Sequence, residues 1–323
     1  MHEWIDALEA HDELAVIQKL NDSLLGNPPR VPPRYLYDTL GSSLYSAITV
    51  LPEYYPSRLE QQILSVQREA IMEAANDADT LIDLGPGDGM KATHLLHATQ
   101  LKRYIGVDIS RDSLRQAVRQ IAQRFERLTV TGLVADFSSG PEWQARIDPG
   151  CPLIFFAGSS IGNFSPEEAV RFLHGLCRIC QSSPTGRGDL LIGVDLLKSC
   201  ALMEAAYDDA LGVTACFNRN VLLHLNRVLK ADFDLGRFRH RARFNALHSR
   251  IDMSLECTSS HSVSWVNGSR HFAEGEQLLT EYSYKYTPER FRQLLERSGF
   301  TLRCQWFDNS QGFMLCLASS HGD

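Results

Sequence analysis

Long apolar runs are missing from this 323-residue chain, and so is any excess of positive charge. No stretch approaches the length of a membrane span, and the acidic start, MHEWIDALEAHDELA, lacks the basic-then-apolar order of a secretory signal. The net charge of −7 argues against nucleic acids and anionic membranes as partners, because both attract concentrated basic surfaces. We therefore expect a cytoplasmic protein, acting as a monomer, with a small molecule as its partner.

The eight cysteines do not form a tight framework, as expected for buried thiols in a reducing compartment. Cys177 and Cys180 make the one C-x-x-C pair, but they fall in a helical pattern without a second pair to complete four zinc ligands. We predict that they pack in the core, and we expect no metal ion.

Short apolar runs alternate with amphipathic segments from about residue 79, which is typical of strand-helix-strand units that build a parallel sheet. Five runs are predicted to be strands: TLIDL (80–84), YIGVD (104–108), VTGLVAD (130–136), LIFFAG (153–158) and LLIGVDL (190–196).

Two helix starts carry capping signals. Ser110 is predicted to cap a helix whose apolar residues recur at helical spacing. Ser165, with Pro166 at the first helical position and Glu168 as reciprocal partner, predicts a complete capping box.

A long stretch after Leu196 interrupts the alternation, with a helical portion, strand-like segments and a hairpin turn at Asn267-Gly268. The pattern resumes with a helix capped by Thr287 and ending at Gly299, followed by two closing strands, TLRCQWF and GFMLCLA. Their link is so short that they must be antiparallel, so one of them opposes the parallel sheet. This predicts an α/β fold with a seven-stranded sheet, which resembles the class I, Rossmann-like methyltransferase fold.

The sharpest local signal is LIDLGPGDG, where an apolar strand runs into a turn containing Gly85 and Gly87. Glycines let a backbone approach a ligand closely, and ligands bind at the carboxyl ends of parallel strands. A dinucleotide fingerprint needs a third glycine at position 90, where this chain has Met90, so the turn instead resembles the methyltransferase motif.

Side chains at the next two strand ends suit a nucleoside. Asp108 stands where nucleotide-binding folds place a carboxylate that accepts hydrogen bonds from ribose hydroxyls. Asp136 and Phe137 supply an acceptor for an exocyclic amine and an aromatic edge, which together suit an adenine ring. Taken alone, the pair fits equally well a turn cap and a core aromatic.

Four segments resemble the ergothioneine-pathway L-histidine Nα-methyltransferase family: YDTLGSSLYSAITVLPEYYPSR, SSIGN, YDDALGVTACFNRNVL and LLTEYSYKY. The similarity covers nearly the whole chain. It implies transfer of three methyl groups from S-adenosylmethionine (SAM) to the α-amino group of free L-histidine, which gives hercynine. It also implies a methyltransferase domain of residues 59–196 and 287–323, and an inserted α+β substrate-binding domain of residues 1–58 and 197–286.

The resemblance also implies site residues. The resemblance places Lys91 at the expected position of a cofactor residue; the other cofactor candidates are Tyr37 and the strand-end residues Gly85, Gly87, Asp108, Asp136 and Phe137. The substrate residues it implies are Tyr45, Tyr54, Asn163, Tyr207, Met253, Glu281 and Ser283. Among these, Glu281 and Ser283 would address the imidazole from one face of a strand, with Met253 beside it.

Methyl transfer from a sulfonium to an amine needs positioning more than activation, so neither a covalent nucleophile nor a metal is expected. Tyr37 and Asn163 are the candidate catalytic residues, since they would orient the lone pair of the amine. Two alternatives remain: a methyltransferase of the same fold that acts on another amino acid such as tryptophan, and a nucleotide-binding module or nicotinamide dehydrogenase. Glu281 favours imidazole over indole, while Met90 and the closing hairpin count against the dehydrogenase.

Overall fold

The structure, a computed structural model, divides into two compact units, each described here by itself. Four stretches of the chain are described: residues 2–7, 13–98, 100–138 and 141–320. Unit 1 combines three segments: Met1–Glu9, Pro56–Leu197 and Lys285–Asp323. Unit 2 combines two segments: Ala10–Tyr55 and Lys198–Tyr284.

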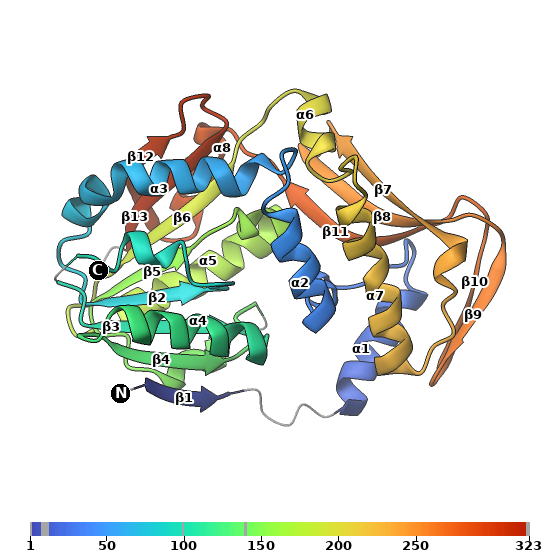
Figure 1. Cartoon of the computed structure of the whole chain (residues 1–323), viewed down its shortest axis with the longest axis horizontal. Helices are drawn as coiled ribbons and strands as arrows, with labels where there is room; N and C mark the ends of the chain where they lie inside the picture. The colour runs from blue at the N-terminus through green and yellow to red at the C-terminus, as the bar shows by residue number, and fades with distance from the viewer. Residues whose placement is uncertain (1, 8–12, 99, 139–140, 321–323) are drawn as a thin grey trace. The chain divides into compact units, whose positions relative to one another are not determined.

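Unit 1 is built on a mostly parallel sheet (Figure 1). Within the described residues it has eight strands in the order β1-β4-β3-β2-β5-β6-β13-β12. Their bounds are β1 (His2–Asp6), β2 (Thr80–Leu84), β3 (Arg103–Asp108), β4 (Thr129–Val134), β5 (Pro152–Phe156), β6 (Asp189–Asp195), β12 (Phe300–Phe307) and β13 (Phe313–Ser320). Only β13 opposes its neighbours, β6 and β12. The predicted α/β class and the antiparallel closing hairpin are confirmed.

The strand count differs from the prediction because β1 adds an eighth strand at the sheet edge. It pairs in parallel with β4, with Glu3 opposite Thr131 and Asp6 opposite Val134. The prediction had grouped these residues with the substrate-binding segment 1–58. The run HEWID is too short and too polar for periodicity to reveal it, and its pairing satisfies the backbone groups of β4 that would otherwise form an open edge.

Helices cover both faces of this sheet (Figure 1). The longer ones are α3 (Tyr55–Ala74), α4 (Arg111–Arg124), α5 (Pro166–Gln181) and α8 (Pro288–Arg297). Short 3-10 turns are η2 (Ala92–His94), η3 (Pro141–Arg146) and η4 (Ser160–Asn163). Apolar residues of α3 and α4 join those of the strands in one buried cluster, whereas α5 and α8 contact each other on the other face.

The helix starts test the capping predictions. The capping box at Ser165 and Glu168 is present in full, and the Thr287 side chain accepts a hydrogen bond from the backbone N–H of Arg290. Ser110 occupies the N-cap position of α4, but its hydroxyl contacts the Ser113 hydroxyl at 3.0 Å and makes no side-chain cap bond. The predicted side-chain cap at Ser110 is therefore wrong, although the helix begins where it was expected.

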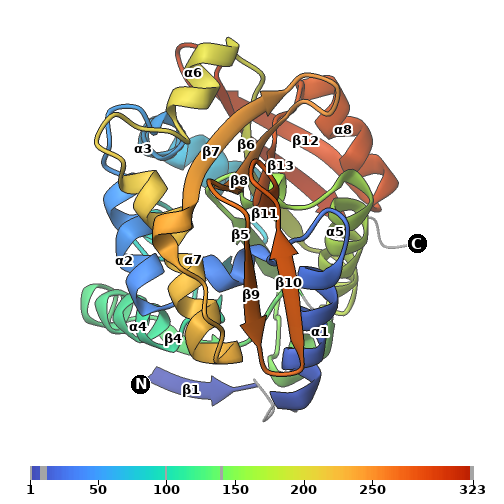
Figure 2. The ribbon, with the colours of Figure 1, turned by 90° about the vertical axis from the view of Figure 1, so that its right-hand side faces the viewer.

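Unit 2 packs helices against a small antiparallel sheet of order β11-β8-β7, with a separate hairpin of β9 and β10 (Figure 2). Its strands are β7 (Phe238–Asn245), β8 (Arg250–Cys257), β9 (His261–Trp265), β10 (Gly268–Phe272) and β11 (Gln277–Tyr284). Its helices are α1 (Glu13–Leu25), η1 (Pro33–Leu36), α2 (Thr39–Ile48), α6 (Cys200–Ala205), α7 (Val213–Leu229) and η5 (Leu235–Arg237). The central helix α7 contacts α2 as well as β7 and β8. The hairpin predicted at Asn267-Gly268 is confirmed, with Asn267 at a φ of 70°.

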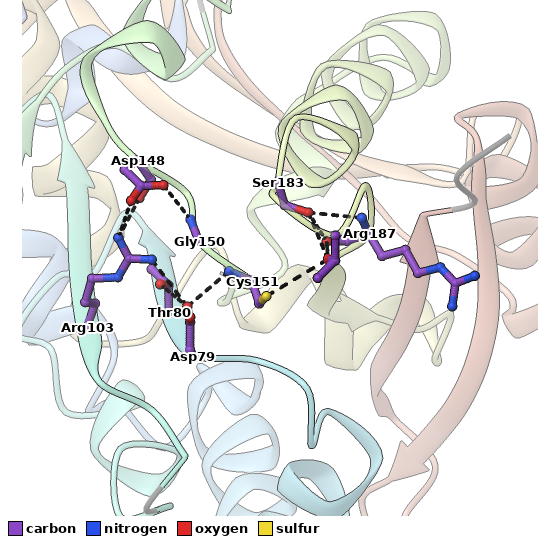
Figure 3. Close-up of polar contacts among 9 residues, drawn as sticks. Asp79, Thr80, Arg103, Asp148, Gly150, Cys151, Ser183 and Arg187 are labelled. Carbon is purple, nitrogen blue, oxygen red and sulfur yellow. Dashed lines mark hydrogen bonds and ion pairs between the residues drawn. The ribbon is translucent and has the colours of Figure 1, made fainter.

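Polar contacts tie together the amino-terminal ends of β2, β3 and β5 (Figure 3). Arg103 lies 3.4 Å from a carboxylate oxygen of Asp79 and 2.9 Å from one of Asp148. The backbone N–H of Cys151 also donates to Asp79 at 3.0 Å. These bonds hold the edge of the sheet opposite to the carboxyl ends, where ligands of parallel sheets bind.

Two further expectations, about the cysteines and about membrane spans, can be compared with the structure. Cys177 and Cys180 are buried on α5, so the predicted core packing is confirmed. Among the residues that the structure describes, no helix has both the length and the apolar character to cross a membrane.

Candidate functional site

The glycine turn of unit 1 directly follows β2, as predicted. Gly85 has a φ of 68° and Gly87 a φ of 58°, values that L side chains rarely adopt. A Cβ added to Gly87 would meet no atom within 4 Å, so the backbone conformation, and not crowding, requires glycine there. The turn is therefore open enough for a ligand to approach its backbone.

Asp108 ends β3 beside this turn. Its carboxylate accepts a hydrogen bond from the backbone N–H of Ser110 at 2.8 Å. Burial raises the pKa of Asp108 to about 6, although backbone N–H groups of Ser110 and Ile109 oppose that shift. At neutral pH the group is thus an ionised acceptor, which suits a pair of hydroxyl donors.

Asp136 and Phe137 follow β4. Asp136 accepts hydrogen bonds from the backbone N–H and the hydroxyl of Ser138, at 3.0 and 2.6 Å. The Phe137 ring is close to the glycine turn, because a Cβ on Gly85 would lie 3.8 Å from it. Phe137 also packs on Phe156 and Phe172, with ring centroids 5.8 and 6.1 Å apart. Phe137 thus has a packing role in unit 1, and contact with adenine stays a prediction.

Lys91 and Asn163 complete the predicted residues of unit 1. Lys91 precedes η2, and its ammonium group lies 2.5 Å from a carboxylate oxygen of Glu60. Asn163 is the last residue of η4, after a turn in which Gly158 and Ser159 have φ values of 74° and 55°.

Asp83, on β2, is a titratable group of this region that the sequence analysis did not single out. Its carboxylate is buried and accepts a hydrogen bond from the Tyr104 hydroxyl at 3.0 Å. Burial raises its pKa to about 7, against the lowering effects of that hydrogen bond and of the Lys91 charge. The signal was present in the sequence, since an acid inside a predicted buried strand needs a partner.

In unit 2, four predicted tyrosines form a continuous aromatic series. The ring centroids of Tyr37 and Tyr45 lie 5.5 Å apart, those of Tyr45 and Tyr54 6.3 Å, and those of Tyr54 and Tyr207 6.1 Å. Burial, together with Tyr45 and Tyr207, raises the pKa of Tyr54 well above its usual value. These rings present aromatic faces, which are favourable neighbours of a cation.

Strand β11 extends this cluster. The Tyr207 hydroxyl lies 2.7 Å from the Ser283 hydroxyl, and both residues are buried. Glu281 is half-buried two residues earlier and pairs across the strands with Met253 of β8. The structure thus brings together the predicted substrate residues of unit 2, while their contacts with a substrate stay predictions.

Helix α7 supplies residues that the sequence analysis quoted in the FNRN segment without giving them a role. The Phe217 ring lies 5.4 Å from that of Tyr37 and 6.1 Å from that of Tyr45. The Asn220 amide donates to Asp38 at 2.7 Å, and Asp38 in turn accepts from the backbone N–H of Gly41 at the start of α2.

The other asparagine of this segment, Asn218, is fully buried. Its amide lies 2.9 Å from Nδ1 of His240, and Nε2 of His240 lies 2.8 Å from the carbonyl oxygen of Tyr207. Burial lowers the pKa of His240, while the Tyr207 carbonyl and the nearby Asp208 and Asp209 raise it. A neutral ring with its proton on Nε2 satisfies both contacts.

The residues of unit 1 fit SAM on the observations above. An open glycine turn, a carboxylate at one strand end and an acceptor with an aromatic ring at the next match a ribose and an adenine. Among the described residues, His, Cys, Asp and Glu side chains do not gather in groups of three or more that would hold a metal ion.

The mostly parallel sheet with its antiparallel closing strand, together with this strand-end site, defines a SAM-dependent methyltransferase of the Rossmann-like class. The sequence profile described as "Histidine-specific methyltransferase, SAM-dependent" matches residues 16–320. The chain belongs to this family.

Curated relatives agree with this assignment. The chain is 39% identical to "Histidine N-alpha-methyltransferase" of Mycolicibacterium smegmatis, over 94% of each chain. It is 36% identical to the protein of the same name from Mycobacterium tuberculosis, over 95% of each chain. "Ergothioneine biosynthesis protein 1" of Neurospora crassa is 26% identical, over 90% of this chain and 33% of the relative.

Proposed function

We propose that the protein transfers three methyl groups from SAM to the α-amino group of free L-histidine and so makes hercynine, in the first step of ergothioneine biosynthesis. The observation that carries the proposal is the cluster in unit 2, where Tyr207 is hydrogen-bonded to Ser283 and Glu281 is paired with Met253. A carboxylate and a hydroxyl two residues apart on one strand suit the two nitrogens of an imidazole. The names of the mycobacterial relatives support the same substrate.

In this proposal Gly85, Gly87, Lys91, Asp108 and the pair Asp136-Phe137 bind SAM. SAM supplies a methyl group on a sulfonium, which is already activated for transfer to an amine. The protein's task is then to hold a neutral amine in line with that methyl group.

Tyr37 and Asn163 are assigned to the amine, whose lone pair they orient, and Tyr37 is also assigned to the cofactor. The amine proton leaves to water, so no residue is required as a covalent nucleophile. As methyl groups accumulate the product becomes a fixed cation, which the faces of Tyr37 and Tyr54 stabilise.

The decisive experiment gives the purified protein SAM with a labelled methyl group and each of the common amino acids in turn. We expect label in histidine only, with a final product heavier by three methyl groups in the mass spectrum. Label in tryptophan and none in histidine would replace the substrate while leaving the methyltransferase assignment intact. A product that stops at one methyl group would remove hercynine from the proposal.

The Tyr37 hydroxyl has its own test. Replacing Tyr37 by Phe is expected to slow the methylation steps by a larger factor than it weakens the binding of S-adenosylhomocysteine (SAH), measured separately, because the ring assigned to the cofactor is kept. Unchanged rates for all three methyl transfers would remove that hydroxyl from the mechanism.

We also propose that the enzyme works in the cytoplasm as a monomer and without a metal ion. All eight cysteines are free thiols, which suits a reducing compartment. Light scattering of the purified protein tests the monomer, and activity that survives prolonged treatment with a chelator tests the metal-free mechanism.

A further inference from the structure

Glu60, on the first turns of α3, is a buried carboxylate with one partner in the proposed SAM site, Lys91, and one in the turn that carries Asn163, Gly158. Its side chain is 0% exposed. Each of its oxygens accepts a hydrogen bond from the backbone N–H of Gly158 at 2.9 Å, and one oxygen lies 2.5 Å from the ammonium group of Lys91. A charge taken fully out of water is costly unless it is paired and hydrogen-bonded, and here it is both.

The fold makes room for this carboxylate at one specific place. A Cβ on Gly193, in the middle of β6, would lie 2.0 Å from Oε1 of Glu60, which is far closer than any contact allows. The sheet backbone therefore approaches the carboxylate closely only because residue 193 is glycine.

The two partners of Glu60 lie after neighbouring strands. Lys91 follows the glycine turn after β2, and Gly158 begins the turn after β5 that carries Asn163. One carboxylate thus fixes both a cation and a backbone turn at the carboxyl edge of the sheet. An ammonium group has three donor hydrogens, so a bond to Glu60 does not prevent Lys91 from binding a ligand.

We propose that Glu60 is a positioning residue that holds the Lys91 ammonium where it binds the carboxylate at the amino-acid end of SAM. The inference rests on the proposed cofactor role of Lys91. The positive charge of Lys91 suits the carboxylate of the ligand. The adenosine end is instead assigned to Asp108 and Asp136, which accept hydrogen bonds, and to the uncharged ring of Phe137. Glu60 therefore acts on one end of the ligand and not on the other.

Two ligands without methyl-transfer activity separate the two ends. SAH contains both adenosine and the amino-acid end, while 5′-methylthioadenosine (MTA) keeps the adenosine thioether and lacks the carboxylate. Titration calorimetry gives the Kd of each for the wild type and for Glu60→Gln, which removes the charge and keeps the shape. Glu69→Gln is the matched control, because Glu69 is an exposed acid on the same helix.

We expect Glu60→Gln to raise the Kd of SAH about 10- to 100-fold, the range for a lost hydrogen bond to a charged group. The Kd of MTA should change by less than about twofold, and Glu69→Gln should change neither. Glu60→Asp keeps the charge but is shorter, so its Kd for SAH should fall between those of the wild type and Glu60→Gln. Glu60→Asp is also the variant to measure if thermal unfolding shows that Glu60→Gln does not fold.

Equal losses of SAH and MTA affinity would mean that Glu60 only maintains the fold, and would overturn the proposal. Unchanged affinity for SAH in both Glu60 variants would overturn it as well. A wild type that binds SAH no better than MTA would instead refute the proposed role of Lys91 itself.

Discussion

The hydroxyl of Tyr207 lies 2.7 Å from the hydroxyl of Ser283, although 76 residues separate the two in the sequence. Both side chains are buried, and buried hydroxyls need hydrogen-bond partners. The contact joins the loop after α6 to strand β11 and brings two predicted substrate residues into one arrangement.

Replacing Ser283 by Ala tests this contact. The Tyr207 hydroxyl would lose this contact, and the imidazole would lose a proposed hydrogen-bond partner, so we expect the KM for histidine to rise about 5- to 50-fold. The Kd of SAH should not change. Ser262→Ala, an exposed position on β9, is the control. An unchanged KM for histidine would remove Ser283 from the substrate site.

Asp83 offers a test of stability against pH without any ligand. Its folded pKa of about 7 lies above the ordinary 3.8, so its contribution to stability is complete below pH 3.8 and is lost as the pH rises through 7. Asp83→Asn keeps an acceptor for Tyr104 and cannot ionise. We expect it to raise the free energy of unfolding at pH 8 by up to about 4 kcal/mol, with little effect near pH 4.

Urea unfolding of the ligand-free protein at both pH values provides the measurement. Asp112→Asn is the control, since that carboxylate is exposed on α4. A stabilisation of the same size at both pH values would mean that packing, and not ionisation, causes the effect.

His240 has the opposite dependence on pH. Burial favours its neutral form, so its pKa lies below the ordinary 6.5. The stability it contributes is therefore present above pH 6.5 and is lost as the pH falls through the folded pKa. Protonation would also place a hydrogen on Nδ1, where the Asn218 amide donates.

The comparison with His240→Gln isolates this group, because glutamine can donate to the Tyr207 carbonyl but does not titrate. Between pH 8 and pH 5 we expect the wild type to lose more free energy of unfolding than the variant. Parallel stability profiles for the two proteins would show that His240 keeps one protonation state throughout this range.

Much of unit 1 is predictable from its sequence, because its buried parallel strands are apolar runs that end in glycine or aspartate. Leu81 to Leu84 illustrates this, since the run leads directly into the glycine turn. The short edge strand β1 is not predictable in this way, because its five residues, HEWID, comprise three polar and two adjacent apolar residues and show no clear period.

The candidate site is only partly predictable, because burial depends on distant residues. Glu60 shares a helix face with Ile63 and Leu64, at the i+3 and i+4 positions, which is a signal that an acid faces the core. Its partners, Lys91 and Gly158, lie 31 and 98 residues away in sequence, and only the fold shows that they converge.

His240 lies in the strand run FRHRARF, where alternation places it on the same face as Phe238 and Ala242, which is a signal of burial. Its partners Asn218 and Tyr207 are distant in sequence, and only the fold shows them.

We propose that Glu281 distinguishes histidine from other amino acids. It is half-buried on β11 and pairs across the strands with Met253, and we propose that its carboxylate accepts a hydrogen bond from an imidazole N–H. Glu281→Ala should then raise the Kd of histidine about 10- to 100-fold, the range for a lost hydrogen bond to a charged group. Glu274→Gln, an exposed acid before β11, is the control.

The two ring-methylated isomers of histidine locate the contact on the substrate. The methyl group of one isomer blocks the nitrogen that donates to Glu281, so the wild type should bind that isomer more weakly than the other. Glu281→Ala should bind the two isomers about equally, because the carboxylate that distinguishes them is gone. The effects of the substitution and of the ring methylation on the Kd are then non-additive, and the size of that non-additivity measures the contact. If the variant keeps the wild-type preference between the isomers, then Glu281 does not bind the imidazole, and substrate choice must depend on other residues of unit 2.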